Sequence, residues 1–197
     1  LPCPRRLPRI TKACKTGGTI CVSHEPVSQM TKRLILTRHA KSSWDDPTTP
    51  DHERPLNECG RAAAADLGAW LASRGYAPDE VLCSDAARTH ETWTGLAPAL
   101  AGSPVLTLKS ALYHAGPDVM LAVLRHAKAD TVMMIGHNPG ISEFAERIVA
   151  QAPMNPEFHR YPTGATLVVS LEVDDWKDVE FGMGAVRDFV VPREIPA

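Results

Sequence analysis

Beyond Met30, short apolar runs alternate with longer segments that carry helical signals. The apolar runs are too short for helices and therefore predict strands, at Leu34–Thr37, Glu80–Cys83, Val105–Leu108, Thr131–Ile135 and Ala165–Val173. A further strand, at an edge of the sheet, is expected at Val179–Gly182. The segments between the runs predict helices, at Glu58–Arg74, Ala86–Leu100, Pro117–Lys128 and Ile141–Ala150.

Residues at the helix ends support this division of the chain. Asn57 is suited to the N-cap of the first helix, and Gly75 follows its end. Pro98 interrupts or ends the second helix, and Pro117 stands near the first position of the third, where proline is favoured. Strands separated by helices of this length indicate βαβ units. We therefore predict one α/β domain, a three-layer sandwich with a mostly parallel central sheet and helices on both faces.

Composition and charge exclude several classes of protein. Hydrophobic residues make up 44% of the 197 residues and charged residues 22%, as in ordinary soluble globular proteins. No apolar run approaches the roughly 20 residues of a membrane-spanning helix, so an integral membrane protein is disfavoured. Residues 1–29 carry five basic residues and one acid, a net charge of +4; since the whole chain carries −2, residues 30–197 carry −6. A nucleic-acid-binding protein usually has a basic folded face, so no nucleic-acid partner is expected.

The first 29 residues differ from the rest of the chain in charge and in pattern. They show no useful periodicity and are basic, as a targeting peptide is, but they lack the amphipathic face of a transit peptide and the apolar core of a secretory signal. We expect Met30 to be the natural start of a bacterial protein and residues 1–29 to be an extension, non-catalytic or disordered. Five cysteines, an odd number without zinc-type spacing, favour a reduced, cytoplasmic protein.

Arginines and histidines follow three of the predicted strands. Arg38 and His39 come directly after the first strand, Arg88 follows the second, and His137 follows the strand at Thr131–Ile135. Ligand sites in open α/β sheets form beyond the carboxyl ends of the strands, so these residues are expected to converge. Two arginines and two histidines with no compensating carboxylate among them would form an anion-binding pocket.

A phosphoryl group suits such a pocket. A guanidinium group can donate two parallel hydrogen bonds to phosphate oxygens, and a neutral imidazole is a nucleophile that can carry a covalent phosphoryl group. Phosphoryl transfer requires little more than in-line positioning and stabilisation of the equatorial charge. We expect no metal or cofactor, because cationic side chains already supply that stabilisation.

The same residues lie in motifs that resemble those of a known family. Leu36–Ala40 (LTRHA) resembles the RHG signature that opens the histidine phosphatase (phosphoglycerate mutase-like) superfamily. Ser84–Thr92 (SDAARTHET) and Gly136–Asn138 (GHN) are similar to its second and third motifs. The motifs stand in the family's order, and the resemblance runs from about residue 33 to the end of the chain. It implies a histidine phosphatase domain over residues 30–197.

Four segments narrow the resemblance to one branch of that superfamily. They look most like the SixA-type phosphohistidine phosphatases and are Arg38–Trp44 (RHAKSSW), Asp51–Gly60 (DHERPLNECG), Gly136–Gly140 (GHNPG) and Tyr161–Ala165 (YPTGA). By this resemblance, His39 is the nucleophile and His137 stabilises the transferring group. Arg38 and Arg88 would bind the phosphate.

Two positions depart from the superfamily pattern. Ala40 replaces the usual glycine after the nucleophile, which is tolerable if its φ is negative. Many members place a carboxylic general acid after the third strand, but Leu112–Gly116 contains none, as in SixA-type proteins. His114 is one candidate proton donor, and Asp45 and Asp118 are weaker ones. A phosphoramidate leaving group can be protonated on its own ring, so the enzyme can also work without a donor.

Side chains near the motifs are further candidates for substrate contact. Ser43 and His114 are predicted to bind substrate, although His114 is equally compatible with an exposed loop position. Arg54 lies near the expected pocket mouth or pairs with an acid of its own loop, Asp51 or Glu53, and pairing is favoured.

We therefore predict a cofactor-independent phosphatase that forms a covalent phosphohistidine on His39. Its substrate is either a phosphorylated small molecule or a phosphohistidine protein. An intramolecular phosphomutase is disfavoured by the missing carboxylic acid. A non-catalytic phospho-ligand binding module would not need a nucleophilic imidazole, and a metallohydrolase built on His39 and His137 lacks an acidic ligand nearby.

Overall fold

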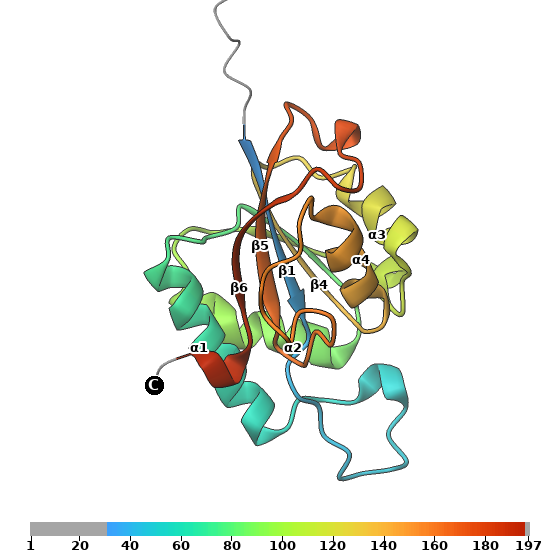
Figure 1. Ribbon diagram of the computed structural model, residues 1–197. Helices are drawn as coiled ribbons and strands as arrows, with labels where there is room; N and C mark the ends of the chain where they lie inside the picture. The colour runs from blue at the N-terminus through green and yellow to red at the C-terminus, as the bar shows by residue number, and fades with distance from the viewer. Residues whose placement is uncertain (1–30, 196–197) are drawn as a thin grey trace, which may run out of the picture.

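The structure, a computed structural model, describes residues 31–195, so the predictions for residues 1–29 lie outside the described part. Its centre is a six-stranded sheet of mostly parallel strands (Figure 1). In spatial order the strands are β3 (Val105–Leu108), β2 (Glu80–Cys83), β4 (Thr131–Gly136), β1 (Thr31–Arg38), β5 (Thr166–Glu172) and β6 (Ala185–Val190). The first four are parallel, and β5 runs antiparallel to both of its neighbours.

Helices cover both faces of the sheet. The helices α1 (Glu58–Ser73) and α2 (Ala87–Leu96) pack on each other on one face, and α3 (Pro117–Leu124) and α4 (Gly140–Ile148) pack together on the other (Figure 1). Successive side chains of a strand point to opposite faces. Accordingly, β1 contributes Ile35 to the core beneath α1 and α2, and Leu34 and Leu36 to the core beneath α3 and α4. The predicted three-layer α/β sandwich is confirmed.

The register of the parallel strands decides where the functional motifs meet. Arg38 at the end of β1 pairs with Gly136 at the end of β4, and Cys83 at the end of β2 pairs with Ile135. The carboxyl ends of these three strands therefore lie side by side at the same end of the sheet. The residues that follow them enter the same space, although each of the three motifs is about 50 positions from the next along the chain.

One predicted strand is wrong. Residues 179–182 form no strand; they belong to the connection between β5 and β6, and Gly182 takes a positive φ of 83° in a turn. The edge strand lies a few residues later, at β6. Several helices are also shorter than predicted: α3 ends at Leu124, and α2 ends at Leu96, where a 3-10 turn containing Pro98 follows.

Candidate active site

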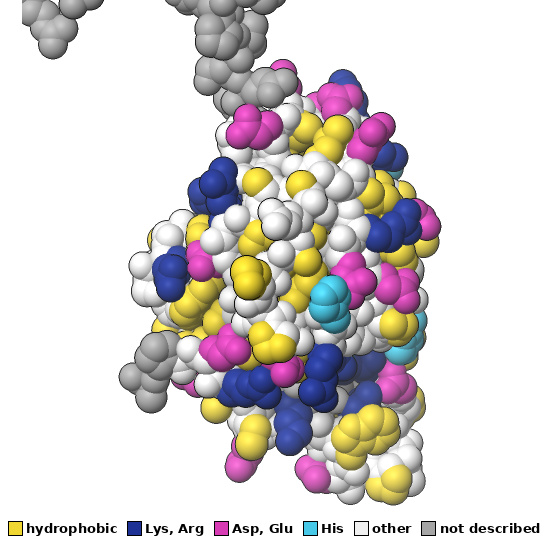
Figure 2. All heavy atoms as spheres, viewed as in Figure 1, with side chains coloured by type: hydrophobic (Ala, Val, Ile, Leu, Met, Phe, Trp, Pro, Cys, Tyr) yellow, Lys and Arg dark blue, Asp and Glu magenta, His cyan; other side chains and the backbone are white. Residues whose placement is uncertain are grey.

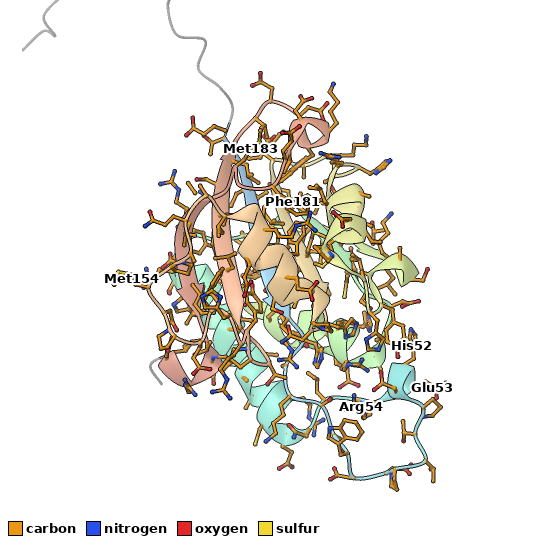
Figure 3. All side chains as sticks on the ribbon, turned by 45° about the vertical axis from the view of Figure 1, so that its right-hand side comes forward. His52, Glu53, Arg54, Met154, Phe181 and Met183 are labelled. Carbon is orange, nitrogen blue, oxygen red and sulfur yellow. The ribbon has the colours of Figure 1, made fainter. Side chains whose placement is uncertain are left out.

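A pocket of about 280 Å³ lies beyond the carboxyl ends of β1, β2 and β4. The four residues predicted to converge, Arg38, His39, Arg88 and His137, all line it. Lys and Arg side chains gather on the part of the surface beneath the strand ends (Figure 2). The loop between β1 and α1 folds back to form one side of the pocket, and it carries Arg54 (Figure 3).

His39 is held by backbone contacts on both sides. Its N–H donates to the carbonyl of Gly136 at 3.1 Å, and its carbonyl accepts from the N–H of Gly164 at 3.1 Å. The side chain is buried, and its Nδ1 lies 2.8 Å from the carbonyl oxygen of Ala40. A carbonyl only accepts hydrogen bonds, so Nδ1 carries the hydrogen and Nε2 keeps its lone pair. This tautomer leaves Nε2 free to act as a nucleophile.

Burial also keeps His39 neutral. Desolvation lowers the pKa of His39 to about 4, and the positive charges of Arg88 and Arg38 act in the same direction. Ala40, which follows it, is buried and is not among the residues with positive φ in the described part of the chain. The methyl group at this position is therefore accommodated without backbone strain.

His137 is a second neutral imidazole in the pocket. Its ring centre lies 5.2 Å from that of His39, and its Nε2 lies 2.8 Å from Oγ of Ser84. Burial, followed by the neighbouring His39 and Arg88, lowers the pKa of His137 to about 2. Its Nδ1 is buried and has no hydrogen-bond partner among residues 31–195.

A close backbone approach explains the glycine that ends the GHNPG segment. A Cβ atom on Gly140 would lie 1.7 Å from the carbonyl oxygen of Ala115, so only glycine fits. This approach brings the start of α4 against the loop that carries His114. The ring of His114 stacks on that of His137, with centres 5.5 Å apart and an interplanar angle of 27°.

The arginines of the pocket present donors that no protein group uses. Arg38 donates from Nη1 to the carbonyl of Tyr161 at 2.9 Å, and Arg88, in the first turn of α2, is only 2% exposed. Within the described residues, the Nε atoms of Arg38, Arg54 and Arg88 are buried without a hydrogen-bond partner. A guanidinium group can only donate, and a buried donor without a partner costs free energy. All three arginines line the pocket, so an anion bound there would meet three positive charges.

The pocket also contains a carboxylate that was not predicted from the sequence. Asp51 lines it and accepts from Nη2 of Arg54 at 2.6 Å and from Nη2 of Arg88 at 2.9 Å. The hydroxyl of Tyr113 donates to the same carboxylate at 2.7 Å. Tyr113 and the two arginines hold the pKa of Asp51 well below its usual range. The expected pairing of Arg54 with an acid of its own loop, Asp51, is present. Nothing in the sequence indicates that Asp51 also contacts Arg88.

Most of the other residues predicted to donate a proton or to bind substrate lie outside the pocket. Of the three proposed proton donors, only His114 lines the pocket. Ser43 donates to the carboxylate of Asp45 on the exposed loop after β1, and neither residue lines the pocket. Asp118 lies in the first turn of α3 and pairs with Arg147 at 3.0 Å.

No group of three or more His, Cys, Asp or Glu side chains that could hold a metal ion occurs among residues 31–195. None of the helices in this part of the chain is long and apolar enough to cross a membrane.

Comparison with known proteins places this geometry in a family. Residues 34–110 match the model of the histidine phosphatase superfamily (branch 1). An uncharacterised chloroplastic protein of Arabidopsis thaliana is 36% identical over 154 residues, which cover 71% of each chain. An uncharacterised protein of Mycobacterium tuberculosis is 32% identical over 166 residues, 79% of this chain and 99% of the relative. The chain belongs to the histidine phosphatase superfamily.

Within the superfamily, this histidine phosphatase is of the SixA type. A solved structure assigned as the phosphohistidine phosphatase SixA of Nakamurella multipartitia superposes with a TM-score of 0.70 at 29% identity. The match covers 82% of this chain and 96% of that one. The resemblance inferred from the motifs is therefore confirmed, and the protein is a phosphatase.

Proposed function

We propose that this histidine phosphatase transfers the phosphoryl group of its substrate to Nε2 of His39 and then hydrolyses the phosphohistidine. The observation that carries the proposal is the state of His39. Its imidazole is neutral, its one N–H group points from Nδ1 to a carbonyl, and its free nitrogen shares a pocket with the guanidinium groups of Arg38, Arg54 and Arg88.

The first half-reaction forms the phosphoenzyme. Arg38 and Arg88 bind the non-bridging oxygens of the phosphoryl group, and the lone pair of His39 Nε2 forms a bond to phosphorus as the bond to the leaving group breaks. The leaving group keeps the electron pair of that bond, so a phosphohistidine that is already protonated on its other ring nitrogen leaves as a neutral imidazole. The hydrogen bond from Nδ1 to the Ala40 carbonyl stabilises the positive charge that develops on the ring of His39.

The second half-reaction regenerates the enzyme. Water attacks phosphorus, the N–P bond breaks, and its electron pair returns to Nε2 of His39 as inorganic phosphate leaves. The ring of His137 lies beside that of His39, and we assign it a hydrogen bond to the transferring group in both halves. Neutrality suits this role, because a neutral imidazole can donate a hydrogen bond without the cost of a buried extra charge.

The proposed substrate is a phosphohistidine on a protein, and the chemistry of the leaving group supports it. The one carboxylate that lines the pocket within the described residues, Asp51, has a lowered pKa and is therefore a poor proton donor at neutral pH. A phosphohistidine leaving group is protonated on its own ring, whereas an alkoxide needs a proton from the enzyme. The likeness to structures assigned as phosphohistidine phosphatases agrees with this choice.

A comparison of three substrates tests the substrate class. We expect the enzyme, with chelator present, to hydrolyse a phosphohistidine peptide fastest and an aryl phosphate more slowly. An alkyl phosphate should be slowest, with kcat/KM at least about 100-fold below that of the peptide, because the pocket offers its alkoxide no carboxylic acid as a proton donor. Equal kcat/KM for the peptide and the alkyl phosphate would contradict the proposed substrate. The alternative substrate, a small phosphomonoester, would then be favoured.

The pH dependence of His39 provides an independent test. Because burial lowers the pKa of His39 to about 4, its ring should be half protonated only near pH 4, whereas an ordinary histidine is half protonated near pH 6.5. NMR titration of the histidine ring protons, with His39→Gln to assign the signal, should give a midpoint about 2.5 units below the ordinary value. The rate of His39 phosphorylation should stay level at neutral pH and fall below about pH 4. A midpoint near 6.5 would contradict the assigned state of the nucleophile.

We also propose a reducing, cytoplasmic location. Cys59 is exposed and Cys83 is buried, and both are free thiols, which supports that proposal.

A further inference from the structure

Asp51 is joined to three segments of the chain that surround the catalytic pocket. It lies in the short 3-10 turn Asp51–Glu53 of the loop between β1 and α1. Its carboxylate contacts Arg54 in the same loop, Arg88 at the start of α2, and Tyr113 in the loop before α3. Among the residues that the structure describes, it is the only acid that lines the pocket.

The contact with Arg88 fixes the orientation of that guanidinium group. Nη2 of Arg88 donates to the carboxylate of Asp51 at 2.9 Å, and Nη1 donates to the main-chain carbonyl of the same residue. At 2% exposure, Arg88 cannot turn toward solvent to satisfy these donors. The plane of its guanidinium group, and hence the direction of its remaining N–H bonds, is set by Asp51.

The carboxylate also anchors the opposite wall of the pocket. The hydrogen bond from the Tyr113 hydroxyl to Asp51 holds the Tyr113 ring in a T-shaped contact with that of His137, with ring centres 5.4 Å apart. The next residue, His114, takes a positive φ of 51°, and its Nε2 lies 3.5 Å from the carboxylate. The rings that border the nucleophile are therefore tied to the same side chain as the arginine.

We propose that Asp51 is a positioning residue for phosphoryl transfer, whose carboxylate aligns Arg88 and the Tyr113–His114 loop with the phosphoryl group and donates no proton. This inference rests on the proposed function. Arg38, Arg54 and Arg88 together outweigh its single negative charge, so the pocket stays attractive to a phosphoryl dianion while Asp51 remains in place. Alignment matters most in the transition state, where the charge to be stabilised develops.

The test compares Asp51→Asn with Glu53→Gln, which removes the same charge from the same turn. Glu53 is exposed, lies at the outer edge of the turn in Figure 3 and does not line the pocket. Both variants of the full chain are assayed with an aryl phosphate and an alkyl phosphate, with inorganic phosphate as inhibitor. For Asp51→Asn we expect kcat to fall about 10- to 100-fold, equally for both substrates, with an inhibition constant for phosphate that is unchanged or lower. Glu53→Gln should keep both constants within about twofold of the wild-type values.

Removal of a negative charge favours any bound anion, which is why phosphate binding should survive while turnover does not. Asp51→Glu keeps the charge and should recover part of the lost kcat, a rescue that a general loss of stability would not produce.

The inference would be overturned if Asp51→Asn kept the wild-type kcat. It would also be overturned if the inhibition constant for phosphate rose in step with the loss of kcat. A rise in kcat would also overturn it and identify Asp51 as a competitor of the phosphoryl group. A larger loss for the alkyl phosphate would make Asp51 a proton donor instead. Absence of phosphoenzyme in the wild type would instead refute the proposed function itself.

Discussion

Replacement of His39 by glutamine lowers kcat by about 10,000-fold or more in our account, with little change in the Tm. Glutamine has about the size of histidine and can keep a hydrogen bond to the Ala40 carbonyl, but its amide nitrogen has no lone pair available for attack on phosphorus. Loss of a covalent nucleophile removes the chemical path, so the remaining groups can only bind the substrate. Steady-state hydrolysis of an aryl phosphate, with a thermal melt of the same sample, provides the measurement.

A second histidine substitution controls for the first. His90→Gln makes the same chemical change at an exposed position of α2 that does not line the pocket, and it should leave kcat within about twofold of the wild-type value. If His39→Gln retains more than about a tenth of the wild-type kcat, the nucleophile is a different residue.

Replacement of Arg88 by lysine has the second-largest expected effect, a fall in kcat/KM of about 100- to 1,000-fold. Lysine keeps the positive charge but loses the planar fork that binds two oxygens at once. It also cannot reproduce the paired contacts with the carbonyl and the carboxylate of Asp51. For an aryl phosphate, kcat should fall and KM should rise, because Arg88 binds the phosphoryl group in the ground state and stabilises it in the transition state.

The matched substitution is Arg74→Lys, at the end of α1, where an exposed arginine pairs with Asp188 at 3.4 Å. It should change kcat/KM by less than about twofold, because an exposed ion pair contributes little and no phosphoryl group contacts it. A kcat/KM for Arg88→Lys within about fivefold of the wild-type value would show that a positive charge at this position is enough for catalysis. The planar guanidinium group would then not be required.

The positions of the four central residues could be predicted because each follows a strand. Arg38, His39, Arg88 and His137 lie where apolar runs end, and the parallel register of β1, β2 and β4 brings those ends to one edge. The order of strands in the sheet was not predicted, but the prediction of the site did not need it. Parallel strands place all of their carboxyl ends on the same side.

Asp51 could not be predicted in the same way, since its role depends on how a loop folds back. Residues 41–57 have no periodicity from which a path could be inferred, and Asp51 meets Arg88 and Tyr113 only in three dimensions. The edge strand was misplaced for a related reason. Residues 179–182 include apolar side chains, but Gly182 turns the chain there, and β6 begins only at Ala185.

The proposed mechanism takes the phosphoryl group through a covalent bond to Nε2 of His39. Its most direct test is rapid acid-free quenching of the wild-type enzyme with a ³²P-labelled substrate, followed by mapping of the labelled residue. We predict a phosphate that is stable in alkali, lost in acid and located on His39, and that forms and decays at rates consistent with kcat. Label on another residue, or turnover without any labelled intermediate even when breakdown is made slow by low temperature, would contradict the account.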